Sequence, residues 1–166
     1  MRNMPSNFLR VALSILFIPV VIYLVFLIEF GIPNVVIGFE EKVPVAIYLA
    51  SLFILLTITI LPFCLTIYEA WTLLNYIDKG QAFSLKSVIS LRRIKYLAVI
   101  IGGIFVLILP LTYVIAQFYN APGFILLALI LGFVSLVIAV FASILQKLLY
   151  EALLIKEEND LTVWGE

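Results

Sequence analysis

The chain has 166 residues, of which 65% are hydrophobic and 12% are charged, with ten Lys and Arg balanced by ten Asp and Glu. A water-soluble domain of this size cannot bury so much apolar surface, so the composition excludes a soluble globular fold and favours a protein that uses the bilayer as its solvent. Histidine is absent and the one cysteine is Cys64, which removes the usual general bases, zinc ligands and disulfides. We therefore expect no enzymatic activity, no metal and no cofactor.

Four runs without a charged side chain follow one another along the chain, over residues 11–28, 43–68, 96–120 and 121–146. Each is long enough to cross the hydrocarbon core, which needs about 20 apolar residues in a helix. The sequence therefore predicts an all-α, polytopic membrane four-helix bundle that forms a single domain over residues 1–166. The helices are predicted over about residues 8–30, 45–77, 85–118 and 123–157, with a loop over 31–43 and a tail over 158–166.

The basic residues are confined to one side of this bundle. Nine of the ten Lys and Arg precede the first helix, lie between the second and third helices, or follow the fourth, and only Lys42 lies in the loop between the first two helices. Because cytoplasmic segments are enriched in Lys and Arg, we expect a plasma-membrane protein with both termini in the cytoplasm. The three later helices exceed the length that the bilayer needs, so we expect them to project two or three turns into the cytoplasm.

The hairpin between the second and third helices carries the first candidate site. Gly80 suits a left-handed position at the end of the second helix, and Ser84 can cap the third. A tight turn would place Glu69 opposite Arg92 and Arg93, where a carboxylate and a guanidinium can pair at the membrane surface. The pair either only locks the hairpin or takes part in binding a partner, and the residues alone leave both roles open.

The fourth helix carries a stripe of small residues at alternating spacings of four and three, formed by Ala128, Gly132, Ser135, Ala139 and Ala142. Small side chains let two helices approach closely in a membrane, so we expect this helix to lie at the centre of the bundle. Ala98 and Gly102, four residues apart on the third helix, are predicted to form the facing surface. The stripe can instead face a second copy of the chain, so a homo-oligomer stays open.

The chain ends in an acidic segment with Lys156, Glu157, Glu158, Asn159 and Asp160. Asn159 is a suitable end for the helix. Carboxylates in a last helical turn oppose the helix dipole, so helix stability does not explain them. The segment either folds back on Arg92 and Arg93, binds a protein partner, or only keeps this end soluble. We expect no direct binding of nucleic acid.

Two short motifs resemble a known family. They are Lys-Gly-Gln-Ala-Phe-Ser at residues 79–84, leading to Leu-Arg-Arg-Ile at 91–94, and the terminal Ile-Lys-Glu-Glu-Asn-Asp-Leu-Thr-Val at 155–163. Along the whole chain the sequence resembles the small bacterial four-helix membrane proteins grouped as domain of unknown function 2975. That family usually has proline where this chain has Ala82, so a looser turn is expected here. Members are often encoded beside a small helix-turn-helix regulator, so the resemblance implies a membrane component of a regulatory pair.

Two functions are consistent with these features. The first is a non-enzymatic membrane regulator or sensor, in which the basic hairpin and the acidic tail bind a cytoplasmic protein such as a small helix-turn-helix regulator. The second is a small permease or immunity-type membrane protein that handles an apolar compound. The second function requires a cavity between the helices near Pro62 and Pro110, where proline frees backbone carbonyl groups.

Overall fold

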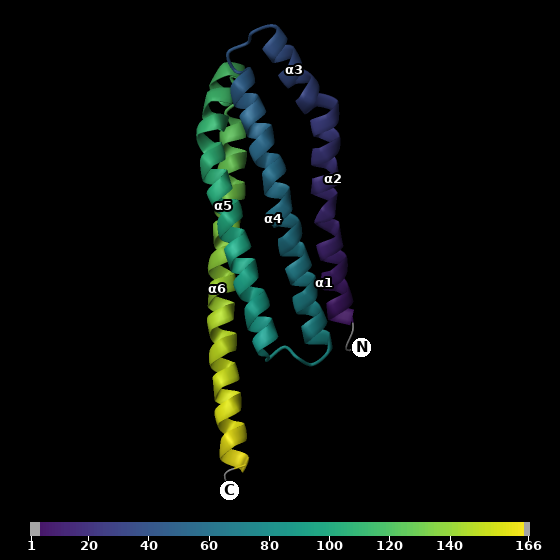
Figure 1. Ribbon diagram of the computed structural model, residues 1–166, viewed down its shortest axis with the longest axis vertical. Helices are drawn as coiled ribbons and strands as arrows, with labels where there is room; N and C mark the ends of the chain where they lie inside the picture. Colours follow the sequence, from purple (N-terminus) through teal and green to yellow (C-terminus); the bar gives the residue numbers. More distant parts are fainter. Residues whose placement is uncertain (1–3, 165–166) are drawn as a thin grey trace.

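The computed structural model describes the chain over residues 4–164, with side chains over 7–161. Within that part all regular structure is helical: α1 (Met4–Ile15), α2 (Phe17–Phe26), the π-helical turn η1 (Leu27–Gly31), α3 (Ile32–Glu40), α4 (Ala46–Asp78), α5 (Leu85–Tyr119) and α6 (Gly123–Trp164). Among these residues, four helical runs are long and apolar enough to cross a membrane: Asn7–Glu40, Ala46–Asp78, Leu85–Tyr119 and Gly123–Leu161. The predicted all-α bundle with four spans is confirmed (Figure 1).

The first span is a bent rod made of α1, α2, η1 and α3. The α-helix of this span is interrupted after Ile15 and again at the turn η1. Proline causes both interruptions, because it has no N–H to donate to the carbonyl four residues earlier. Pro19 leaves the Ile15 carbonyl without a helical donor, and α1 ends at Ile15. Pro33 does the same to Glu29, which lies within the π-helical turn.

The loop predicted over residues 31–43 is wrong, because α3 carries the first span on to Glu40. The predicted first helix ends at about residue 30, shortly before Pro33. Proline is accepted in the first turn of a helix, and here it stands at the start of α3. Gly31 is buried, and a Cβ on it would lie 3.2 Å from the ring of Phe53. The glycine therefore allows a close approach to α4 and does not end the helix.

The turn between α4 and α5 forms as the sequence predicts. Gly80 adopts a left-handed conformation with φ of 73°. Ser84 caps α5, and its side-chain oxygen accepts a hydrogen bond from the backbone N–H of Ser87 at 3.4 Å. The Ser87 hydroxyl is fully buried and donates to the Gln81 carbonyl at 3.0 Å, which fixes the turn against the start of α5.

The central helix is α5, which packs on α4 along one side and on α6 along the other. The expectation that the fourth helix is central is therefore wrong. The small-residue stripe of α6 faces α5: Ala128, Ala139 and Ala142 are buried, and a Cβ on Gly132 would lie 3.2 Å from Cβ of Phe105. The structure thus uses the stripe within one chain, with Ala98 and Gly102 of α5 also buried.

The first span packs much less tightly than the other three. Its closest backbone contacts with α4 come from α1 and α3, near its two ends, and among the described residues of α2 none is buried. It makes no extended contact with α5 or α6 in the described part of the chain. The bundle is therefore open between the first span and α6.

One end of the bundle holds the start of α1, the α4–α5 turn and the end of α6, and we call it the basic end (Figure 1). Because Gly102 meets Leu136 in the antiparallel pair, Leu85 at the start of α5 lies near Leu153. Residues 154–164 of α6 continue past the turn for about 16 Å, or three helical turns. Among the described helices, α6 extends beyond the rest of the bundle, and the extension of α4, α5 and α6 into the cytoplasm stays a prediction.

The tail predicted over residues 158–166 is helical as far as the structure describes it. Asn159 does not end α6, which runs on to Trp164. Asparagine inside a helix costs only a fraction of a kcal/mol, about 0.7 at most, so the helix can continue through this position. A straight helix also excludes the alternative in which the acidic segment folds back on Arg92 and Arg93.

Candidate functional site

The structure brings Glu69 of α4 and Arg93 of α5 together. Nη1 of Arg93 donates to Oε1 of Glu69 at 3.2 Å. The Glu69 side chain is 9% exposed and that of Arg93 is 63% exposed, so the arginine reaches in from the surface toward a buried carboxylate. The second carboxylate oxygen, Oε2, is buried and has no hydrogen-bond partner among the described residues. The pair therefore links α4 to α5 close to the basic end.

Arg92 does not join this pair. It lies in a groove between α5 and α6, which also holds Lys95 of α5 and Lys147 of α6. The groove has a volume of about 490 Å³, and Ser143, Gln146 and Tyr150 of α6 contribute polar groups to its wall. Arg93 therefore contributes to the contact between α5 and α4. Arg92 and Lys95 line the groove toward α6, together with Lys147.

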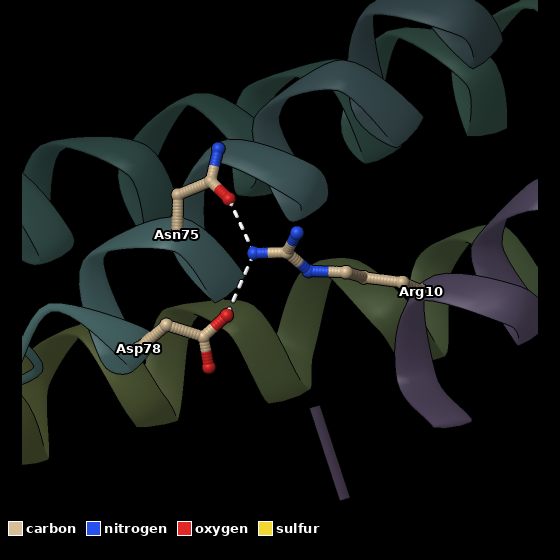
Figure 2. Close-up of polar contacts among 3 residues, drawn as sticks. All are labelled: Arg10, Asn75 and Asp78. Carbon is tan, nitrogen blue, oxygen red and sulfur yellow. Dashed lines mark hydrogen bonds and ion pairs between the residues drawn. The ribbon is translucent and has the colours of Figure 1, made fainter. Parts of the chain in front are cut away.

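A second charged contact, which the sequence analysis missed, fastens the first span to α4 at the basic end. Figure 2 shows the guanidinium of Arg10 between Asn75 and Asp78, with Nη2 at 2.6 Å from an oxygen of each. The guanidinium also lies over the ring of Trp71, 5.3 Å from its centroid. The sequence does contain a signal for this contact, because Arg10 directly precedes the first apolar run and Asp78 directly follows the second predicted helix, at the same end of an antiparallel pair.

A large cavity lies among all four spans, in the half of the bundle away from the basic end. Its volume is about 580 Å³, within the range of sites for small molecules. Aromatic side chains from α2, η1, α4, α5 and α6 line it, including Phe26, Phe53 and Phe105, and none of the described lining residues is charged. It flanks Pro110 through Ile108 and Thr112, and Pro62 does not line it.

A small polar cluster lies at one edge of this cavity. The Tyr23 hydroxyl of the first span is 3.1 Å from both the Phe53 carbonyl and the Thr57 hydroxyl of α4. Thr57 in turn donates to the Phe53 carbonyl at 2.7 Å. This cluster gives the first span a polar contact with α4 near the middle of its length.

The remaining predicted residues occupy the projecting end of α6 and the interface between α5 and α6. Lys156, Glu157, Glu158, Asn159 and Asp160 are exposed on the projecting end. Ser135 of the stripe donates to the Leu131 carbonyl of its own helix at 3.0 Å. Among the described residues, no group of three His, Cys, Asp or Glu side chains lies close enough to bind a metal ion.

The fold and these contacts define a polytopic helical membrane protein with a basic end and an apolar cavity. The chain belongs to the DUF2975 family, described as proteins of unknown function, whose sequence profile matches residues 7–163. It is 44% identical over 164 residues to the uncharacterized membrane protein YoaS of Bacillus subtilis (strain 168), an alignment that covers 98% of this chain and 100% of YoaS. No solved structure matches this chain significantly. The family resemblance found in the sequence is confirmed.

Proposed function

We propose that this protein is a non-enzymatic membrane regulator that binds a cytoplasmic protein through the projecting end of α6. The observation that carries the proposal is that residues 154–164 continue as a helix beyond the α4–α5 turn, with no neighbouring helix of the described chain beside them. A helix that protrudes in this way adds nothing to the packing of the bundle. It does offer a partner a preformed helical surface.

The chemistry of the projecting end supports recognition by a protein. Leu154 and Leu161 are exposed, Leu161 to 73%, and they lie seven residues apart on one helix face. Glu157 lies between them on that face, and Asp160 is next to Leu161. Exposed leucines beside carboxylates fit a partner that has an apolar groove with a basic rim. The concentration of Lys and Arg at this end of the bundle supports a cytoplasmic location.

The family context supplies a first partner to test. Co-purification from mild detergent should retain a small helix-turn-helix regulator of the kind that the family resemblance implies, and deletion of the residues after Lys156 should release it. The double variant Glu157→Gln/Asp160→Asn should weaken retention about tenfold if the two charges face a basic rim. Its matched control, Glu40→Gln/Glu41→Gln, removes two carboxylates at the opposite end and should leave retention unchanged. Equal retention by the wild type and the truncated chain would contradict the proposal.

The apolar cavity favours a second function, the binding of a neutral apolar compound from the lipid phase. The cavity is confined to one half of the bundle. In the other half α5 and α6 are in close contact through the buried Ala98, Ala139 and Ala142. This arrangement suits a binding pocket better than a transport path.

Filling the cavity tests this second function. Leu131 lines the cavity, whereas Leu129, which is similarly exposed, does not. Leu131→Trp should abolish the fluorescence increase of an apolar probe such as N-phenylnaphthylamine, and Leu129→Trp should preserve it. Identical probe binding by the two variants would rule the cavity out as the site.

A further inference from the structure

The groove between α5 and α6 gathers three cations from segments about fifty residues apart in the sequence. Arg92 and Lys95 lie on one wall, and Lys147 lies on the other. Carboxylates are missing from the described residues that line the groove. Like charges repel each other, so folding alone gives no reason to bring three cations together.

Among the described residues, no carboxylate forms an ion pair with these three cations. Within the described chain, the ion pairs at the basic end are Arg93 with Glu69 and Arg10 with Asp78, and they involve none of the three groove cations. Lys95 has its ammonium 4.8 Å from the centroid of the Tyr96 ring, a contact that leaves its charge in place. The groove therefore carries a net charge of +3 from side chains that are available to an anion.

The neutral groups of the groove suit a phosphate oxygen. Ser143 and Tyr150 carry hydroxyl groups and Gln146 carries an amide, and all three can donate hydrogen bonds. A guanidinium such as that of Arg92 can donate two parallel hydrogen bonds to a phosphate, and lysines add point charges. This combination of cations and neutral donors matches a phosphate better than a single carboxylate.

The position of the groove points to a lipid as the source of the phosphate. Beyond Lys95 and before Lys147 both helices enter runs without charge, over residues 96–120 and 121–146. Val99 and Val140 lie about one turn further along the same helix faces, and both are half exposed. A phosphate held in the groove would thus have an apolar surface next to it, along which an acyl chain can lie.

We propose that this groove binds the phosphate of an anionic phospholipid, with Arg92, Lys95 and Lys147 as its charged ligands. The bound lipid stabilises the contact between α5 and α6 at the point where the two helices leave the apolar part of the bundle. The site lies on the bundle side of the projecting end of α6, so it does not depend on the proposed protein partner.

The test compares lipids on the full-length protein in a neutral detergent. Native mass spectrometry counts how many molecules of phosphatidylglycerol, phosphatidylcholine or inorganic phosphate stay bound to the protein, with each compound added at the same concentration. The wild type should prefer phosphatidylglycerol, and each groove substitution, Arg92→Gln, Lys95→Gln or Lys147→Gln, should lower the preference about fivefold, since one basic residue near an anionic surface contributes about 1 kcal/mol. Lys147→Arg should keep it.

A matched triple variant separates a site from general attraction. The groove triple, Arg92→Gln/Lys95→Gln/Lys147→Gln, should lose the preference for phosphatidylglycerol. The control triple, Lys79→Gln/Lys86→Gln/Lys156→Gln, removes the same charge from the same end without touching the groove, and it should keep that preference. Equal losses in the two triples, or no loss in the groove triple, would overturn the proposal, as would full displacement of the lipid by inorganic phosphate. If the groove triple lost a protein partner and kept its lipid preference, the groove would belong to an acidic protein, and the lipid proposal would fail.

Discussion

Glu69 and Arg93 differ in burial, so replacing one of them with a neutral residue should cost a different amount of stability from replacing the other. Glu69 is buried against the bundle, whereas most of the Arg93 side chain is in contact with solvent. An arginine that loses its partner here returns to water. A carboxylate that loses its partner stays buried with two unsatisfied oxygens, because Oε2 already has no partner among the described residues.

Neutralising each partner in turn tests this asymmetry. Arg93→Met should lower the free energy of unfolding by about 1–3 kcal/mol, since it leaves a buried carboxylate unpaired. Glu69→Gln should cost less, because the amide is neutral and the arginine is exposed. The measurement is unfolding by SDS in mixed micelles, followed by circular dichroism. The double variant should be no less stable than Glu69→Gln alone, and a double variant that is as unstable as Arg93→Met would contradict this explanation.

Arg10 is the residue that ties the first span to α4, and its energetic coupling to Asp78 can be measured directly. A double-mutant cycle with Arg10→Met and Asp78→Asn should give a coupling energy of about 1 kcal/mol, because the pair is partly buried and also bonded through Asn75. The control cycle combines Arg10→Met with Glu69→Gln, which are not paired. Its coupling should stay within about 0.5 kcal/mol, and similar values in the two cycles would show that the Arg10 contact has no specific role.

At the scale of elements, the tight seam between α5 and α6 depends on glycine. A Cβ on Gly132 would meet the Cβ of Phe105, which is fixed to the α5 backbone and cannot rotate away. Gly132→Leu should therefore force the helices apart and cost about 1–3 kcal/mol in the same unfolding assay. Gly103→Leu is the matched control, since nothing lies within 4 Å of a Cβ at that position. Equal stability of the two variants would argue against close packing at this seam.

The sequence predicts the helical elements well because the signals that define them are local. Runs without charge give the spans, and Gly80 with Ser84 gives the turn between α4 and α5. The extension of the first span to Glu40 could not be predicted in this way. It depends on a π-helical turn that accommodates Pro33 and on the contact of Gly31 with Phe53.

The partners of the charged residues are harder to predict from the sequence, because they depend on rotation about the helix axis. Arg92 and Arg93 are adjacent, so their side chains point about 100° apart on α5. One therefore meets α4 and the other faces α6, although the spacing from Glu69 is compatible with either arginine. The cavity is equally hard to predict from the sequence. It requires the first span and α6 to stay apart, and no local pattern in the sequence encodes that separation.

At the scale of the whole molecule, the bundle has two unlike halves. Toward the basic end, ion pairs fasten the helices and α5 packs closely on α6. Away from it, the first span stays apart from α5 and α6 and leaves an apolar cavity with the contact between the Tyr23 and Thr57 hydroxyls at its edge. A change in what fills the cavity could move the first span with little disturbance of the seam between α5 and α6. The two halves are therefore suited to respond separately to the lipid phase and to a partner at the basic end.

We expect the basic end of the bundle to face the cytoplasm, because moving its cations across the membrane is costly, and labelling of intact cells can check this orientation. In a Cys64→Ser background, Gln81→Cys places a thiol in the α4–α5 turn and Glu41→Cys places one in the α3–α4 turn, and both positions are exposed. An impermeant maleimide should label position 41 in intact cells and position 81 only after permeabilisation, because eight of the nine cations in the described part of the chain lie toward the basic end and favour the cytoplasm. The background protein alone should remain unlabelled. Labelling of position 81 from outside would reverse the orientation and place the projecting helix where no cytoplasmic partner could reach it.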